Sequence, residues 1–159
     1  MLVNSRMAAL GPPPVGASSD GVDLDPRLAA ILADGLLEIG GCVVLAHDAD
    51  SVTDAPIESF PDATGFEAFI NHVHVDDELG LPATDTAVLA QAGRFATEIG
   101  DLLQRRYPDE TFVIILAVSD SCIVRFHTLR SGERWVAPDL ETYENEAVMV
   151  MQVPFAASP

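Results

Sequence analysis

The chain has 159 residues and a formal net charge of −17, from 25 acidic and 8 basic residues; every basic residue is arginine, because lysine is absent. This charge repels nucleic-acid phosphates and anionic membranes, so direct binding to either is not expected. No uncharged apolar run approaches the roughly 20 residues that span a bilayer, and we expect a soluble protein with the cytoplasm as its default location.

The first 24 residues are predicted to be a disordered tail. They contain the run Pro12 to Pro14 with glycines on both sides, and they show no hydrophobic periodicity. Folding is expected to begin near Asp25, so residues 25–159 are predicted to form a single α+β domain.

The first predicted helix starts at Asp25 and Pro26, a pair typical of an N-cap and the first helical residue. Apolar residues at helical spacing continue to Ile39, and the glycine pair at 40–41 predicts the helix end. The apolar run 42–46 then predicts a buried strand. Residues 47–65 combine five carboxylates with two prolines and are interpreted as an acidic loop.

The remaining elements follow in the second half of the chain. Residues 66–75 alternate as a strand does. A long amphipathic helix is expected from Thr84 or Asp85 to Tyr107. Residues 111–130 form two apolar runs around a serine-rich turn and predict a β-hairpin, and residues 147–153 predict the last strand.

These elements follow one another in the order αββαβββ. We therefore expect an α+β fold, in which a mostly antiparallel sheet of about five strands carries two helices on one face. The two cysteines, Cys42 and Cys122, lie in strand-like apolar runs, where free cysteine usually behaves as a buried hydrophobic residue. A disulfide between them is the alternative, but unpaired thiols in a reducing compartment fit the pattern better.

Familiar catalytic motifs are missing: the sequence has no G-x-S-x-G elbow, glycine-rich phosphate loop or Cys-x-x-Cys pair. The leading hypothesis is a small acidic intracellular protein, without a cofactor, that docks onto or neutralises a basic protein partner, as immunity proteins and antitoxins do. Acidic residues of the 47–65 loop would steer the partner, and aromatic residues would anchor it. The predicted partner-binding residues are Asp48, Asp50, Asp54, Glu58, Phe60, Asp62, Trp135 and Tyr143.

The acidity can also arise without a binding partner. Adaptation to high salt depletes lysine and enriches aspartate, and a GC-rich coding bias replaces lysine with arginine without producing the negative excess. A self-associating structural component is a further possibility, and the sequence does not fix the oligomeric state.

An alternative hypothesis starts from the stretch INHVHVDDELG at residues 70–80. On a strand, His72, His74 and Asp76 would project on the same side, because side chains repeat every second residue. Two imidazoles and a carboxylate can hold one divalent metal ion, with Asp77 or Glu78 as a general base. The competing interpretation, which we favour, places both histidines at a strand end and starts a solvated loop at Asp76.

A second cluster lies in the segment RFHTLRSGERW, which contains Arg125, His127, Arg130 and Arg134 beside Trp135. Such a patch can bind an anion. Its arginines can instead pair with carboxylates inside the protein, which we favour because the geometry is common and acids are abundant nearby. The expected acidic partners are Asp139, Glu141, Glu144 and Glu146.

Overall fold

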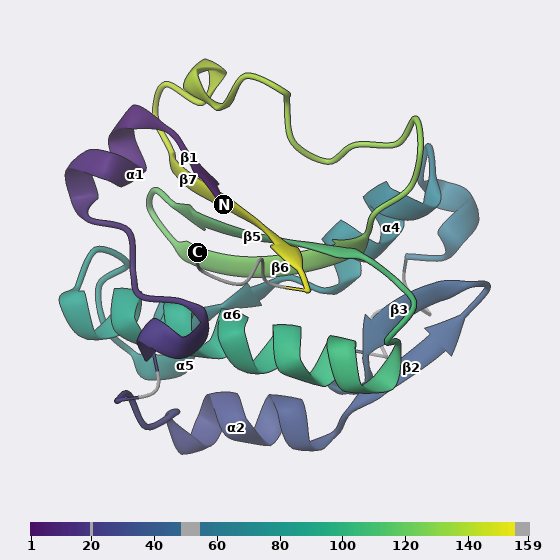
Figure 1. The fold of residues 1–159 in the computed structure, drawn as a ribbon, viewed down its shortest axis with the longest axis horizontal. Helices are drawn as coiled ribbons and strands as arrows, with labels where there is room; N and C mark the ends of the chain where they lie inside the picture. The colour runs from purple at the N-terminus through teal and green to yellow at the C-terminus, as the bar shows by residue number, and fades with distance from the viewer. Residues whose placement is uncertain (20, 49–54, 155–159) are drawn as a thin grey trace.

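A computed structural model describes residues 1–19, 21–48 and 55–154. The protein has an α+β fold, with a five-stranded antiparallel sheet and a separate two-stranded sheet (Figure 1). The fold class and the largely antiparallel sheet predicted from the sequence are thereby confirmed. None of the helices in the described ranges combines the length and the apolar character that a membrane-spanning helix requires.

The central sheet has the strand order β1-β7-β5-β6-β4. Strand β5, whose side chains are all apolar, lies in its middle and is buried along its whole length. The predicted hairpin is present, with β5 and β6 paired from Phe112 and Thr128 to Val118 and Cys122. The strands are β1 (Leu2–Val3), β4 (Val73–His74), β5 (Phe112–Val118), β6 (Cys122–Thr128) and β7 (Ala147–Val153).

One face of the sheet is covered by the long helix α6 (Thr86–Arg106), as predicted. Asp85 caps this helix by accepting a hydrogen bond from the Ala87 amide at 2.8 Å. Helix α2 (Pro26–Ala33) packs on the side of α6 that faces away from the sheet (Figure 1). The main core fills this face and includes Leu28, Val88, Phe95, Ile99, Leu103, Phe112, Ile114, Leu116, Val124, Phe126 and Met149.

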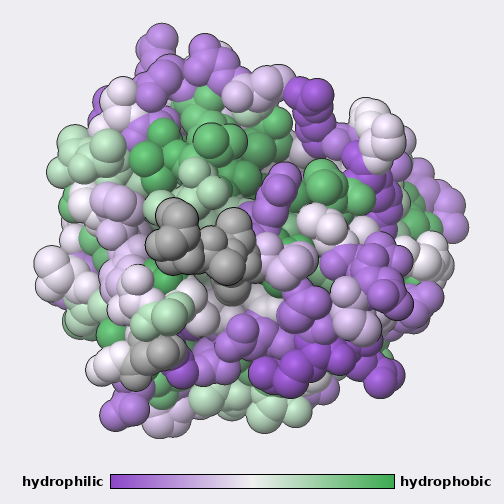
Figure 2. Space-filling model, in the orientation of Figure 1, coloured by the Kyte–Doolittle hydropathy of each residue, from purple (hydrophilic) through white to green (hydrophobic). Residues whose placement is uncertain are grey.

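The other face of the sheet is covered by segment 129–146, which crosses above the strands in Figure 1 and contains the short turn η4 (Leu140–Thr142). Its core cluster is smaller and consists of Val113, Ile115, Leu140, Val148 and Val150. Figure 2 shows a hydrophobic patch on this side, between α1 and segment 129–146. The cover over this face is therefore less complete than the cover that α6 provides.

Residues 1–19, predicted as part of a disordered tail, instead form β1, helix α1 (Ser5–Leu10) and the turn η1 (Gly16–Ser19). Asn4 is 2% exposed; it caps α1 and accepts a 3.0 Å hydrogen bond from the Val148 amide. Met7 is fully buried, and a Cβ at Gly93 of α6 would lie 2.4 Å from the Pro14 carbonyl oxygen. Contacts with residues far along the chain order this segment, which has no local periodicity.

The predicted helix 25–39 is too long. Helix α2 ends at Ala33, Gly35 has a φ of 83°, and β2 (Leu36–Ile39) pairs with β3 (Cys42–Leu45). Gly40 and Gly41 both have positive φ, as a two-residue hairpin turn requires. The glycine pair therefore connects two strands; the predicted helix start, with Asp25 as N-cap and Pro26 as the first helical residue, and the strand at 42–46 are confirmed.

The strand predicted at 66–75 is also wrong, apart from its end. Residues 63–70 form helix α4 (Ala63–Ile70), β4 contains only Val73 and His74, and helix α5 (Val75–Leu79) follows. Asp62 starts α4 by accepting a 2.7 Å hydrogen bond from the Gly65 amide. The sequence pattern of residues 66–75 showed no polar side, because several residues of α4 are buried against both sheets. The preceding acidic region contains the short turns η2 (Ala46–Asp48) and η3 (Ile57–Ser59).

Candidate functional site

Helix α4 is fastened to the strands on both sides of it by two fully buried polar residues, Glu67 and Asn71. The Glu67 carboxylate accepts hydrogen bonds from the amides of Val43 in β3, at 2.7 Å, and of Thr128 in β6, at 2.6 Å. The Asn71 side chain donates to the Val43 carbonyl at 2.9 Å. The helix therefore lies between the two sheets, and buried hydrogen bonds to both of them fix its position.

Arg130 completes this fastening. Its guanidinium donates two hydrogen bonds to the Glu67 carboxylate, both at 2.8 Å, and that contact raises the pKa of Arg130. Internal pairing is thus correct for Arg130, but its partner is Glu67 and not one of the acids at 139–146. The sequence interpretation missed Glu67 because it placed residue 67 on a strand.

His127 lies beside this ion pair and is 3% exposed. Its Nδ1 is 2.9 Å from the Thr128 carbonyl oxygen. Burial lowers the pKa of His127, because the charged imidazolium is poorly solvated there; the hydrogen bond to Thr128 and the Glu67 charge oppose this shift. His127 is therefore a neutral core residue, and it is not available to bind an anion at the surface.

Arg125 stacks on Trp135, with its guanidinium carbon 5.2 Å from the ring centroid. Its Nη1 donates to the Ala68 carbonyl of α4 at 3.3 Å. Burial lowers the pKa of Arg125, and the charge of Glu146 opposes that effect. Trp135 itself stays 39% exposed, so Arg125 joins α4 to an indole ring on the surface.

A separate chain of ring contacts starts at Phe69 of α4 and continues into the residues that follow the helix. Phe69 is 44% exposed, and its centroid lies 5.3 Å from that of Phe60 and 5.7 Å from that of His72. The rings of His72 and His74 follow, 5.2 Å apart. We call this region the α4 surface and define it by Phe69, His72, His74, Arg125 and Trp135.

The residues of the metal hypothesis are not arranged as a ligand set. Asp76 is 8% exposed, and its Oδ1 accepts hydrogen bonds from the Ser121 hydroxyl, at 2.9 Å, and the Cys122 amide, at 2.8 Å. His74 Nδ1 lies 2.7 Å from the Ser121 hydroxyl. Within the described ranges, no three His, Cys, Asp or Glu side chains form a group that could hold a metal ion.

The same contacts do not form a nucleophilic triad. In such a triad the carboxylate orients the imidazole, whereas Asp76 binds the hydroxyl and the backbone of the β5–β6 turn. His47 lies apart, 3.2 Å from Asp34. The Cys122 thiol is unsuited to catalysis as well, because burial raises its pKa to about 12.

The predicted anchors differ in their exposure. Trp135 is exposed, but Phe60 packs against Phe66 with centroids 5.5 Å apart. The Tyr143 hydroxyl accepts a 3.0 Å hydrogen bond from the Ala137 amide, and the ring packs on the smaller core cluster. Phe69 is the anchor that the sequence interpretation missed. The signal for it was weak, because on a helix over 63–70 Phe69 lies next to the fully buried Phe66, and both rings contact Phe60.

The predicted acidic residues are only partly described. Asp50 and Asp54 lie outside the described residues, and of Asp48 only its place in η2 is described. Glu58 is exposed, while Asp62 is the cap of α4. Among the members whose side chains the structure describes, Glu58 is the exposed carboxylate that can steer a partner.

Many other carboxylates are exposed and lie outside arginine ion pairs. Within the described part of the chain, arginine ion pairs involve Asp25, Glu67 and Glu98. None of these belongs to the exposed set, which leaves the negative surface charge largely uncompensated. The exposed acids include Asp23, Glu38, Glu58, Asp77, Asp101, Asp109, Glu110, Asp120, Asp139, Glu141 and Glu144.

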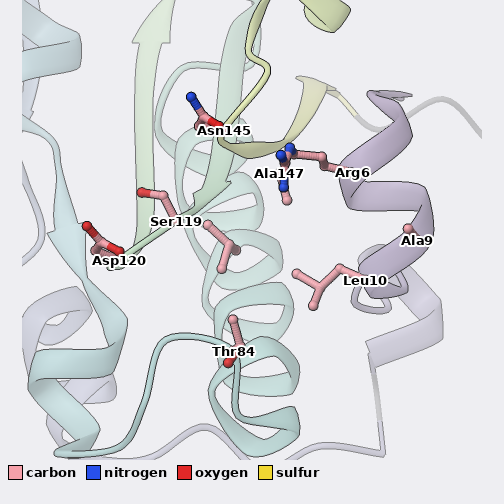
Figure 3. A pocket seen from close by; sticks show the side chains of 9 residues that line it. Arg6, Ala9, Leu10, Thr84, Ser119, Asp120, Asn145 and Ala147 are labelled. Atoms are coloured by element: carbon pink, nitrogen blue, oxygen red, sulfur yellow. The ribbon is translucent and has the colours of Figure 1, made fainter.

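An open hollow of about 610 Å³ lies at the other end of the sheet, between α1 and the β5–β6 turn (Figure 3). Arg6 lines it from α1 and Asp120 from the turn, over apolar side chains that include Leu10 and Val118. A cation and an anion share this hollow, so its charge selects neither anionic nor cationic ligands. We assign it no function.

A family model, described as the uncharacterized protein PM0498 family, matches residues 13–157 of the chain. No curated protein and no solved structure matches it. The matched range includes α2, α4, segment 129–146 and every residue of the α4 surface.

Proposed function

The chain belongs to the uncharacterized protein PM0498 family, and we propose that it is a docking protein that binds a basic protein partner through the α4 surface. The exposed carboxylates steer the partner, and Phe69 and Trp135 anchor it. Binding of this kind would neutralise the partner, as immunity proteins and antitoxins do for toxins.

One observation carries the proposal: two large aromatic side chains, Phe69 and Trp135, are 44% and 39% exposed beside a helix that buried polar contacts hold in place. Exposed aromatic residues on a rigid frame are typical binding anchors, because little conformational entropy is lost when they are covered. Nothing in the described core requires either ring to be at the surface.

The charge supports a basic partner and argues against nucleic acid or an anionic membrane. A net charge of −17 with few compensating ion pairs attracts a cationic protein and raises its association rate at low salt. Two free, buried cysteines, Cys42 and Cys122, support a reducing, cytoplasmic setting.

The test is affinity capture from the native host with three forms of the chain. The first is the wild type, and the second is the double variant Phe69→Ser, Trp135→Ser. The third is a matched control, Leu37→Ser with Leu81→Ser, because these leucines are 43% and 42% exposed and do not belong to the α4 surface. We expect the wild type and the control to retain the same protein, rich in lysine and arginine, and the double variant to lose it.

Kinetics with the purified captured protein then test the mechanism. The association rate constant should fall at least about tenfold between low salt and 0.5 M salt. Glu58→Lys should slow association more than Asp101→Lys, because Asp101 is exposed on α6, on the opposite side of the sheet. An acidic captured protein, equal capture by all three forms or a salt-independent rate would each overturn the proposal.

A further inference from the structure

We infer that the α4 surface binds arginine side chains of its partner, presented on an extended basic segment. The inference rests on the proposed function and deepens it, because it names the chemical group that the surface takes. It follows from the ring surface left open on α4, the carboxylates at its rim and the way the protein already binds one of its own arginines.

Arg125 shows that the indole ring accepts a guanidinium. Its guanidinium carbon lies 5.2 Å from the Trp135 centroid, within the distance at which a cation is attracted to an aromatic face. With Arg125 in place, Trp135 is still 39% exposed. Ring surface therefore remains for a second planar cation from outside.

Phe69 and His72 provide a second group of rings, and Arg125 links it to Trp135 because its guanidinium also donates to the carbonyl of Ala68, next to Phe69. The centroids of Phe69 and His72 are 5.7 Å apart, and Phe69 is 44% exposed. An arginine side chain has an apolar stem that packs on such rings while its guanidinium stays at the edge, in contact with water. The length of this second group, which continues to His74, suits an extended segment better than a single isolated side chain.

A carboxylate lies near each of the two groups of rings. Near the second group, Asp77 Oδ2 is 3.8 Å from His74 Nδ1, and the Asp77 side chain is 78% exposed. Near the first group, Glu133 lies two residues before Trp135, and its Oε2 accepts a 3.0 Å hydrogen bond from the Thr64 amide of α4. A guanidinium stacked on the rings could reach either carboxylate in the bidentate geometry that arginine favours.

The same features discriminate against lysine. A guanidinium is planar and weakly hydrated, so it stacks on an aromatic ring with little loss of solvation. An ammonium is compact and strongly hydrated, and it gains mainly from the long-range charge, which any cation shares. A site of this kind should therefore bind an arginine peptide more tightly than a lysine peptide of the same charge.

The test uses the full chain, whose single tryptophan is Trp135, so that its fluorescence reports on the site directly. The probes are blocked peptides Gly-Arg-Gly-Arg-Gly and Gly-Lys-Gly-Lys-Gly, titrated at low and at 0.5 M salt. We expect the arginine peptide to change the emission saturably and to bind at least about fivefold more tightly than the lysine peptide, with the difference maintained at high salt. Phe69→Ser should remove the difference, and the Leu37→Ser control should keep it.

Equal affinities for the two peptides at both salt concentrations would overturn the inference, as would an arginine preference unchanged in Phe69→Ser. Neither result would affect capture of a basic host protein through Phe69 and Trp135, so the proposed function would stand. Conversely, an arginine preference without any captured partner would support this inference and contradict the proposed function.

Discussion

The two faces of the central sheet are built differently, and strand β6 shows the difference residue by residue. Toward α6 it places Cys122, Val124 and Phe126, all fully buried. Toward segment 129–146 it places Ile123 and Arg125, both partly exposed, and the buried but titratable His127. The same strand thus serves an apolar core on one side and a polar, partly open layer on the other.

The contrast indicates that the two faces serve different purposes, one mainly stability and the other binding. The α6 face contains nearly all of the large buried side chains, so most of the hydrophobic stabilisation comes from that face. The other face has a cluster of five buried apolar residues and, toward α4, ends in Arg125 and Trp135. Because folding depends less on this second face, exposed rings and charges can be kept there for binding.

The largest expected effect is on the α6 face. Phe126→Ala should lower the free energy of unfolding by about 3 to 5 kcal/mol, because a fully buried phenylalanine leaves a cavity in a close-packed core. Ile123→Ala, three residues earlier on the opposite face, should cost less than half as much. Urea denaturation followed by circular dichroism measures both values, and equal losses would contradict the division between the faces.

A second prediction concerns the buried ion pair that fastens α4. Arg130→Ala should lower the free energy of unfolding by about 3 kcal/mol, because it leaves the fully buried Glu67 carboxylate without its cation. Arg134→Ala, an exposed arginine of the same segment, is the control and should change stability by less than about 0.5 kcal/mol.

If Arg130→Ala were as mild as the control, the ion pair would contribute little to holding α4. The hydrogen bonds of Glu67 and Asn71 to the neighbouring strands, together with apolar contacts, would then be sufficient.

The third prediction uses pH to separate the faces, because His127 lies on the second face only. Its pKa is lowered in the folded state, so below the unfolded value of about 6.5 the unfolded chain binds more protons. Stability should therefore fall as pH decreases from about 6.5, by at most about 1.4 kcal/mol per pH unit. In His127→Asn this part of the decrease should be absent, and urea denaturation from pH 7.5 to 5 measures it.

The carboxylates whose pKa is lowered, Asp25 and Glu133, act in a separate range. Their stabilising effect is present above their ordinary pKa values, 3.8 for aspartate and 4.5 for glutamate, and is lost as pH falls below those values toward the lowered pKa values of the folded state. An unchanged pH dependence in His127→Asn between pH 6.5 and 5 would therefore show that His127 is not buried as a neutral residue.

The sequence predicted the α6 face well, because its elements are long and strongly patterned. The stripe of α6 follows the 3.6-residue period, and β5 is apolar throughout, so both are recognisable from local residues. The hairpin between β5 and β6 and the last strand were confirmed for the same reason.

The parts that failed depend on contacts between distant residues. Helix α4 looked like a strand because Glu67 and Asn71 are buried by hydrogen bonds to β3 and β6, which no local pattern reveals. The first 19 residues looked disordered because they have no local hydrophobic pattern. They are ordered by distant contacts, since Asn4 binds β7 and Met7 packs in the core. Trp135 could be singled out as an anchor from its residue type. The exposure of Phe69 could be recognised only once the structure showed residue 69 on helix α4.

The smallest expected effect completes the comparison. Phe69→Ser should lower the free energy of unfolding by about 1 kcal/mol at most, since the ring is 44% exposed and its buried part packs on Phe60 and His72. Trp135→Ser should cost about 1 kcal/mol at most, which is the contribution of the stacking on Arg125. Circular dichroism during urea denaturation measures both, since Trp135 is the single tryptophan, and Leu37→Ser is the matched control.

These small values matter as much as the large ones. Two exposed aromatic rings that contribute little to folding need another reason to be on the surface, and binding supplies it. A loss above about 2 kcal/mol in either variant would show instead that the ring completes the core of the second face. Both faces would then serve mainly to stabilise the fold, and the exposed rings of the α4 surface would no longer indicate a binding site for a partner.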